Sequence, residues 1–135
     1  MRDILFRGKR VDNGEWVQGF YLSSPEFDNK GIAVITVDKP RTPCYVYKET
    51  IGQYTGLTDK NGKKIFEGDI VKDLGGYMDG IPRAVVWDEG TMEFETYLVR
   101  KHWAYGTNRV RLWLIKDREL EVIGNIHDNP ELLGE

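Results

Sequence analysis

Residues 51–71 read IGQYTGLTDKNGKKIFEGDIV, and this stretch decides the fold class. Its Asn61-Gly62 pair lies between Leu57 and the apolar pair Ile65-Phe66. Asn-Gly between apolar runs is a strong signal for a β-hairpin, because tight hairpin turns need residues that tolerate a positive φ. Glu67-Gly68-Asp69 predicts a tight turn or bulge that leads into a further strand. The stretch therefore predicts consecutive antiparallel strands.

The N-terminal residues show the same kind of pattern. Asn13-Gly14 separates two short apolar runs, residues 4–6 and 16–22, and this spacing predicts a first hairpin. Residues 23–31 hold Ser, Pro, Asp, Asn and Gly, which is typical of a surface loop. The β-branched run at 32–37 then predicts a buried strand.

Two prolines follow this run. Because proline has no backbone N–H, Pro40 and Pro43 predict that regular strand pairing resumes only at Cys44. After the central stretch, residues 84–87 predict a strand and Asp88-Glu89-Gly90 predicts a turn.

The last third of the chain adds further strands. Met92, Phe94, Thr96 and Leu98 alternate, which predicts that they share one face of a strand. Residues 111–115 and 120–126 complete the strands. A short helical turn is expected at the C-terminus, with Pro130 in its first position. Because turns rather than helices separate the strands, we expect a mainly β fold of antiparallel strands in an SH3-like or partly open barrel arrangement.

The composition is that of an ordinary globular protein. The chain has 135 residues, 40% hydrophobic and 30% charged, which suffices for a core of its own. Its net charge of −3 argues against a general binder of polyanions, since such proteins carry a clear basic excess. The single cysteine, Cys44, forms no internal disulfide, and no segment approaches about 18 consecutive apolar residues. We therefore expect a cytoplasmic protein without a membrane span.

Three blocks of the sequence carry a family resemblance. They are Phe6-Arg7-Gly8-Lys9-Arg10 with Gly14-Glu15-Trp16-Val17-Gln18-Gly19, residues 52–71, and the ending Val122-Ile123-Gly124-Asn125-Ile126-His127-Asp128-Asn129-Pro130-Glu131-Leu132-Leu133. Together they closely resemble the YopX family, whereas residues 23–50 and 75–115 fit it loosely. The resemblance implies a small β-rich protein of phages or prophages, without an established activity or catalytic residues.

The domain organisation follows from the same comparison of residues. The resemblance spans the start, middle and end of the chain, so we expect a single YopX-like domain over residues 1–135. Residues 69–94 also resemble an SH3-like barrel, with a GDIV strand, a glycine-rich loop and a return strand. A sub-division into an N-terminal hairpin region, 1–50, and an SH3-like barrel region, 51–135, is the alternative. Neither architecture implies a function.

Catalytic and metal-binding patterns are scarce in this sequence. Glu67 and Asp69 form an i, i+2 carboxylate pair, and a hydrolase would need two carboxyl groups placed opposite each other. The simpler interpretation is a solvated turn in which the two acids cap backbone N–H groups. Cys44 is expected to be a half-buried strand thiol. We predict no catalytic residues, no metal site and no cofactor.

The strongest candidate for a working surface is residues 100–111, which combine basic and aromatic side chains. The candidate residues there are Arg100, Lys101, Trp103, Tyr105 and Arg109. Such a cluster can contact phosphates and stack bases, can anchor a protein interface, or can cover the end of a barrel. All three interpretations remain open at this point.

A second candidate is the glycine-rich segment 75–80, which contains Tyr77 and Met78. Apolar side chains in such a loop are costly to expose unless another surface covers them. The sequence thus favours a non-enzymatic binding module that binds a protein partner or copies of itself. We expect no binding to a membrane. The alternative is a nucleic-acid-binding SH3-like module that uses residues 100–111.

Overall fold

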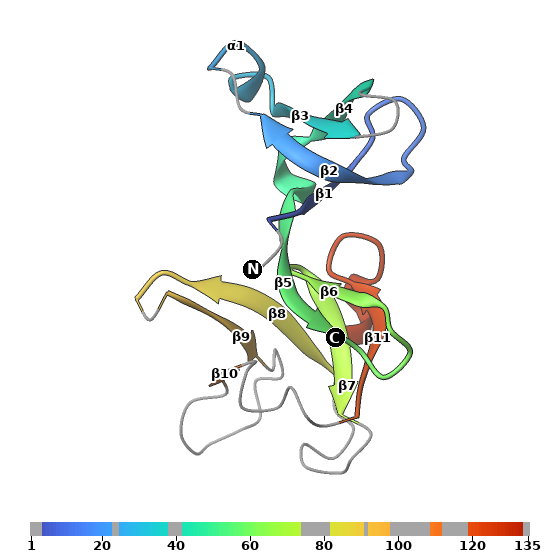
Figure 1. Cartoon of the computed structure of the whole chain (residues 1–135), viewed down its shortest axis with the longest axis vertical. Helices are drawn as coiled ribbons and strands as arrows, with labels where there is room; N and C mark the ends of the chain where they lie inside the picture. The colour runs from blue at the N-terminus through green and yellow to red at the C-terminus, as the bar shows by residue number, and fades with distance from the viewer. Residues whose placement is uncertain are drawn as a thin grey trace. The chain divides into compact units, whose positions relative to one another are not determined.

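The structure is a computed structural model, and it describes residues 4–22, 25–37, 42–73, 82–90, 92–97, 109–111 and 119–133. These residues form antiparallel β-strands with few and short helices, as Figure 1 shows. The prediction of a mainly β fold with a partly open strand arrangement is confirmed. The chain divides into two compact units, Met1–Tyr54 and Thr55–Glu135, which are described separately.

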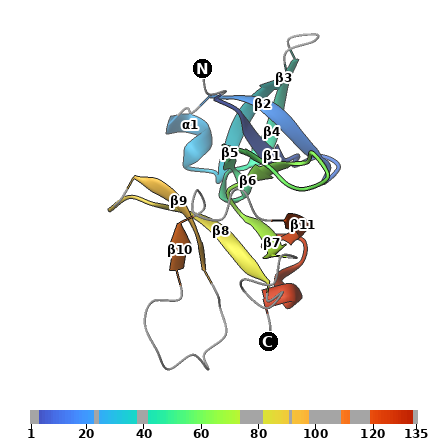
Figure 2. The ribbon, with the colours of Figure 1, turned by 60° about the horizontal axis from the view of Figure 1, so that its bottom comes forward.

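The N-terminal unit is one antiparallel sheet with two short helices. Its elements are β1 (Phe6–Lys9), β2 (Trp16–Leu22), α1 (Pro25–Asp28), β3 (Ile32–Val37), β4 (Thr42–Tyr47), the 3₁₀ helix η1 (Lys48–Thr50) and the first residues of β5 (Gly52–Thr58). The strands lie in the order β4-β3-β2-β1-β5. Figure 2 shows β2, β3 and β4 of this unit with α1 nearby.

The first hairpin is where the Asn13-Gly14 signal places it. β1 and β2 pair from Phe6 opposite Gly19 to Lys9 opposite Trp16. Gly14 has a φ of 74°, the left-handed conformation that glycine adopts without a Cβ clash. The first hairpin prediction is therefore confirmed.

Two details of this unit correct the sequence interpretation. The predicted loop over residues 23–31 contains the four-residue helix α1, which begins at Pro25, a position where the missing N–H does no harm. Pro43 does not interrupt pairing, since it lies within β4 opposite Thr36. In the sheet order β4 is a terminal strand, and proline is tolerated there because an edge N–H needs no partner strand.

The core of the N-terminal unit lies on one face of the sheet. Ala33, Ile35 and Val46 are buried there, and partly buried apolar side chains pack against them: Phe6, Val17, Tyr21 and Ile51. Cys44 is also buried, at 6% exposed, and so lies deeper than the expected half-buried position.

The C-terminal unit contains the rest of β5 and the remaining strands. These are β6 (Lys64–Phe66), β7 (Asp69–Asp73), β8 (Arg83–Asp88), β9 (Glu93–Tyr97), β10 (Arg109–Arg111) and β11 (Leu120–Asn125), followed by the 3₁₀ helix η3 (Pro130–Leu133). One sheet has the order β10-β9-β8-β7-β11, and β6 lies beside β5. The second hairpin, the turn before β7 and the C-terminal helical turn are all confirmed.

Asp59 holds the second hairpin to a distant strand. Its Oδ1 accepts hydrogen bonds from the backbone N–H of Asn61 at 2.8 Å and of Lys63 at 2.9 Å. Its Oδ2 accepts one from the N–H of Val122 in β11, at 3.0 Å. The side chain is only 7% exposed. A single carboxylate thus fixes both the local turn and a contact between segments 63 residues apart.

The core of the C-terminal unit comes from five of its strands, β6, β7, β8, β9 and β11. Ile65, Val71, Val85, Phe94 and Leu120 form the buried cluster, with Leu57, Trp87 and Val122 packed against it. Trp87 and Phe94 meet edge to face, with ring centroids 4.8 Å apart.

The predicted alternation in β9 is only partly correct. Phe94 and Thr96 are buried as expected, but the intervening Glu95 is buried as well. Met92 lies outside the strand, in a turn with a φ of 57°, and is 67% exposed. Because the strand begins at Glu93, Met92 does not share its face.

Candidate functional site

The outer face of the N-terminal sheet is the most distinctive surface among the described residues. Residues that lie directly opposite in an antiparallel pair point to the same face. The register places Phe20 opposite Thr36, and Leu22 opposite Val34. β3 and β4 extend the same face, with Val34 opposite Tyr45 and Ile32 opposite Tyr47.

This outer face carries large apolar side chains that remain in contact with solvent. We define it by its four exposed members, which are Phe20 at 56%, Leu22 at 57%, Tyr45 at 51% and Tyr47 at 41% exposed. Between them lie the half-buried side chains of Ile32, Val34 and Thr36. Single exposed apolar residues are normal, but a contiguous group of them on one sheet face is typical of a binding surface.

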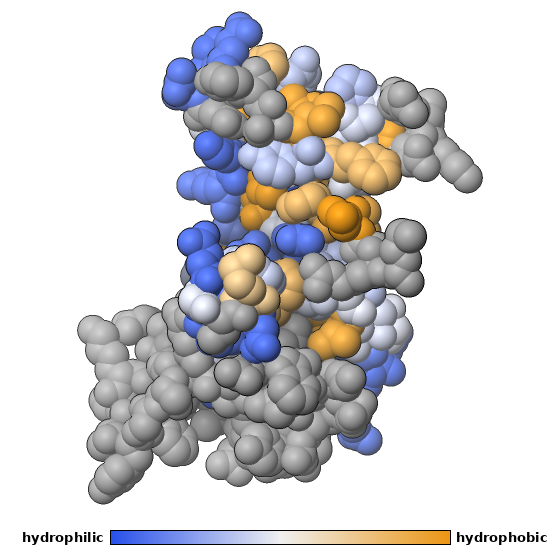
Figure 3. Space-filling view, turned by 60° about the vertical axis from the view of Figure 1, so that its left-hand side comes forward, coloured by the Kyte–Doolittle hydropathy of each residue, from blue (hydrophilic) through white to orange (hydrophobic). Residues whose placement is uncertain are grey.

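Across β2, β3 and β4 this face carries no formal charge, and the nearest charges on the same side of the sheet are Arg7 and Lys9 of β1, opposite Gln18 and Trp16. β2 reads WVQGFYL, β3 reads IAVITV and β4 reads TPCYVY, so the three strands contain no Asp, Glu, Lys or Arg. The described surface of the N-terminal unit shows apolar patches beside hydrophilic ones in Figure 3. Edge strands normally carry charges that discourage association, and β4 lacks them.

Aromatic contacts at its margins hold the face in place. Phe27 of α1 packs on Tyr45, with ring centroids 5.6 Å apart. On β1, the guanidinium of Arg7 lies 4.8 Å from the ring centroid of Trp16, a cation–π distance. These contacts restrict side chains at two borders of the surface and so reduce the ordering cost of binding.

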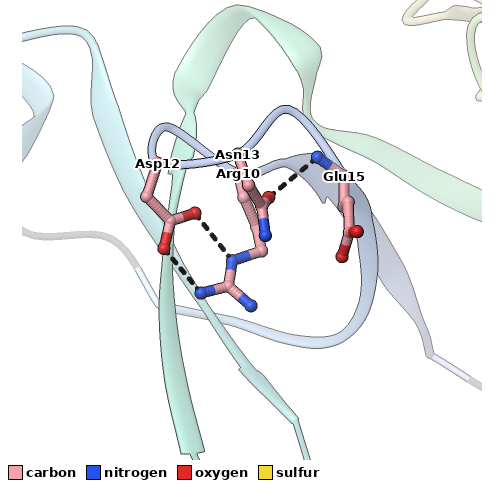
Figure 4. Close-up of polar contacts among 4 residues, drawn as sticks. All are labelled: Arg10, Asp12, Asn13 and Glu15. Carbon is pink, nitrogen blue, oxygen red and sulfur yellow. Dashed lines mark hydrogen bonds and ion pairs between the residues drawn. The ribbon is translucent and has the colours of Figure 1, made fainter.

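The loop that connects β1 to β2 is polar and lies beside β4 (Figure 4). Arg10 donates two hydrogen bonds to Asp12, from Nε to Oδ1 at 3.0 Å and from its terminal nitrogen to Oδ2 at 2.7 Å. Asn13 Oδ1 accepts a hydrogen bond from the N–H of Glu15 at 2.9 Å. The N–H of Val11 donates to the carbonyl oxygen of Tyr45, which joins this loop to β4.

The loop and β4 enclose a small depression of about 220 Å³. Its lining comes from Arg10, Val11, Asp12, Pro43, Cys44 and Tyr45. Pockets that enclose small-molecule ligands usually measure about 300–1,000 Å³. The depression is therefore too small for a typical ligand pocket, and its guanidinium is already paired with Asp12.

The Arg10–Asp12 pair gives a prediction about pH. The hydrogen bond from Arg10 lowers the pKa of Asp12 below its ordinary value of 3.8. In the variant Arg10→Gln we expect the pKa of Asp12 to return toward that value, as measured by NMR titration of the side-chain carboxyl carbon. Because both groups lie at the surface and solvent screens them, Asp12→Asn should leave the thermal midpoint unchanged within error. A clear loss of stability would contradict this.

The residues singled out in the sequence lie mostly outside the described part of the chain. Arg100, Lys101, Trp103, Tyr105, Tyr77 and Met78 all do so. Arg109 begins β10, where its backbone pairs with Tyr97, the last residue of β9. The segment 98–108 thus joins two paired strands, and the residues proposed there stay a prediction.

The carboxylate pair Glu67 and Asp69 lies at the turn before β7, as predicted. Asp69 is only 1% exposed, so the expected solvated position is wrong for this residue. Its Oδ2 accepts a hydrogen bond from the N–H of Phe66 at 2.8 Å, which confirms the capping role. Within the described ranges there is no cluster of three or more His, Cys, Asp or Glu side chains that could hold a metal ion.

Sequence reasoning missed the outer face of the N-terminal sheet. β2 contains apolar residues at both odd and even positions, so alternation does not reveal which set is exposed. In β4 a signal was present, since Tyr45 and Tyr47 alternate with Cys44 and Val46. Tyrosine carries a polar hydroxyl that suits the wetter of two faces.

The family assignment rests on a match over nearly the whole chain. The family model described as YopX protein matches residues 5–134. The chain belongs to the YopX family. Among solved structures, the crystal structure of protein EF1440 from Enterococcus faecalis is similar to this YopX-family protein, with 25% sequence identity and a TM-score of 0.55. The similarity covers 98% of this chain and 99% of that one.

The other comparison gives no further relative, since no curated protein matches the chain. The helices in the described part of this YopX-family protein include none long and apolar enough to cross a membrane.

Proposed function

We propose that this YopX-family protein is a prophage-encoded, non-enzymatic binding module that acts through protein–protein contacts or self-assembly. The observation that carries the proposal is the outer face of β2, β3 and β4, where Phe20, Leu22, Tyr45 and Tyr47 are exposed together. Tyrosine and phenylalanine are enriched at protein interfaces, and charged residues are depleted from interface cores. This face has both properties.

The same features argue for a protein partner over a small ligand. A binding site for a small molecule encloses most of the ligand in a concave pocket with a few convergent polar groups. The outer face instead lies on three paired strands, and the depression at its border is small. An exposed apolar face of this kind suits a second folded surface.

The basic and aromatic residues of 100–111 supply a second contact in this proposal, together with Tyr77 and Met78. Arg100, Lys101 and Arg109 also support the alternative of a nucleic-acid-binding SH3-like module in the bacterial cytoplasm. Phosphate-led binding weakens steeply with salt because counterions are released, whereas an apolar protein interface changes little. The two functions therefore differ in their response to salt and to nuclease.

Affinity capture tests the proposal. Tagged full-length protein is expressed in its bacterial host and recovered with and without nuclease, beside the variants Phe20→Lys and Met92→Lys. Met92 is a matched control, since it is also a large exposed apolar residue and gains the same charge. We expect the wild type to recover a discrete protein, which can be a second copy of this chain. This protein should remain bound after nuclease treatment and in 0.5 M salt (about three times physiological ionic strength). Its recovery should be lost with Phe20→Lys and kept with Met92→Lys.

Two results would overturn this function. Loss of all recovered material upon nuclease treatment would favour the nucleic-acid module. Equal recovery with the wild type and with both variants would show that the outer face does not carry the binding.

A further inference from the structure

We propose that the outer face of β2, β3 and β4 packs against the same face of a second copy of this chain, related by a two-fold axis. This inference rests on the proposed function, which is binding to a protein. It adds that the partner is a second copy of the chain. It is carried by three observations, which concern the charge of the face, its area and the state of its edge.

The charge of the face permits self-association. In a two-fold interface each patch meets its own copy, so any net charge on the patch repels itself. β2, β3 and β4 contain no Asp, Glu, Lys or Arg. The ion pair at the border, Arg10 with Asp12, is neutral as a unit. β2, β3 and β4 therefore bring no charge to the second copy, and the guanidinium of Arg7 at the β1 border lies over the ring of Trp16.

The exposed area agrees with a two-fold dimer. Aromatic side chains of this size present about 150–250 Å² each. With 41–57% of Phe20, Leu22, Tyr45 and Tyr47 exposed, these four residues leave on the order of 400 Å² of surface uncovered. Two copies would bury about twice that area from these residues alone, and a standard interface buries about 1,200–2,000 Å² in total. The remainder has to come from the half-buried Ile32, Val34 and Thr36 and from residues around the face.

The edge of β4 indicates that the copies meet face to face. An unpaired edge strand would invite a second copy to extend the sheet. Here the carbonyl oxygen of Tyr45 accepts a hydrogen bond from the N–H of Val11 at 3.0 Å, and Arg10 forms a bridge with Val46. The loop after β1 thus occupies part of this edge, while the apolar face stays open.

Sedimentation equilibrium of the full chain tests the proposal over a range of protein concentrations. We expect the wild type to reach twice its chain mass of 15.6 kDa. Phe20→Lys places two like charges in the interface and should weaken the dimer by roughly a hundredfold or more. Met92→Lys, with the same change in charge at a position that is 67% exposed against 56% for Phe20, should dimerise like the wild type. Circular dichroism confirms that each variant is folded.

A mixing experiment identifies which surfaces meet. Phe20→Lys and Phe20→Glu should each be monomeric alone, and a one-to-one mixture should contain more dimer than either variant alone, since one interface then holds opposite charges in place of two like charges. A dimer that persists in Phe20→Lys with the affinity of the wild type would overturn the face-to-face arrangement. A wild type that stays monomeric at high micromolar concentration would overturn the second copy as partner.

The capture experiment separates failure of this inference from failure of the proposed function. If the wild type is monomeric but Phe20→Lys still releases a captured protein, the outer face binds a different protein and the binding function stands. If the wild type is monomeric and Phe20→Lys recovers the same proteins as the wild type, both the dimer and the binding function of the outer face are wrong.

Discussion

Replacing Asp59 with alanine should cost this protein about 3–4 kcal/mol of its free energy of unfolding. The carboxylate accepts three backbone hydrogen bonds, from Asn61, Lys63 and Val122, and the side chain is only 7% exposed. Hydrogen bonds to a charged group contribute about 1.5–3 kcal/mol each. In the variant, the N–H groups of the exposed turn can form hydrogen bonds with water instead. The loss of unfolding free energy is therefore smaller than the sum of the three hydrogen bonds.

The measurement is urea unfolding of the wild type and variants at pH 7. Asp59→Asn should lose about half as much as Asp59→Ala, since its amide oxygen can still accept from the turn while its NH₂ group meets the N–H of Val122. Asp88→Ala is the matched control, since Asp88 caps the exposed N–H of Gly90 at 2.8 Å. We expect it to cost about 1 kcal/mol or less. Equal losses at positions 59 and 88 would contradict the role of the distant bond.

The effect of Asp59 should depend on pH. Burial raises its pKa, but the backbone hydrogen bonds from Val122, Lys63 and Asn61 outweigh burial and hold it below the ordinary 3.8. A carboxyl whose pKa is lowered in the folded state stabilises the fold above its unfolded pKa, and the contribution is lost as pH falls through the folded value. The difference between wild type and Asp59→Ala should therefore be full at pH 5 and above, and shrink below about pH 4.

Gly19→Ala should destabilise the N-terminal unit by about 3 kcal/mol or more. A Cβ at this position of β2 would overlap the carbonyl oxygen of Thr36 and lie 2.8 Å from its carbonyl carbon. Both atoms belong to the backbone of β3, so no side-chain rotation relieves the clash. The strands would have to separate where Phe20 pairs with Thr36. Thermal unfolding followed by circular dichroism measures this loss.

Gly31→Ala is the matched control for the glycine itself. Gly31 has a φ of 71°, and nothing lies within 4 Å of a Cβ placed there. Its replacement should cost only about 1–2 kcal/mol, the ordinary penalty of an L-residue in the left-handed region. A Gly19 variant as stable as this one would show that β2 and β3 can separate at little cost.

Much of the fold was accessible from the sequence, because its signals are local. The Asn-Gly turns at 13–14 and 61–62 required glycine for a positive φ, and both hairpins formed there. Pro130 marked the C-terminal helical turn. The errors arose where a local rule met tertiary context: Pro43 was accommodated in a terminal strand, and Met92 fell in a turn.

The candidate site was not accessible in the same way. The sequence indicated Trp103, Tyr105 and the basic residues around them, since aromatic and charged side chains are conspicuous in a polar segment. The outer face of the N-terminal sheet consists of ordinary strand residues such as Phe20 and Tyr45. Their importance comes only from lying side by side on three strands, and that depends on the register.

By itself, the sequence determined the family, the antiparallel β class and the positions of the turns. The strand class and the turns depend on residues close together in the chain, whose φ preferences and alternation act over a few positions. The family is carried by three blocks of sequence at the start, middle and end of the chain. The tertiary structure alone decided that Asp59 reaches Val122, that Gly19 lies against the backbone of Thr36, and that β2, β3 and β4 leave an uncharged apolar face exposed. These features depend on which strands pair and in which register, a choice made by the packing of the whole unit.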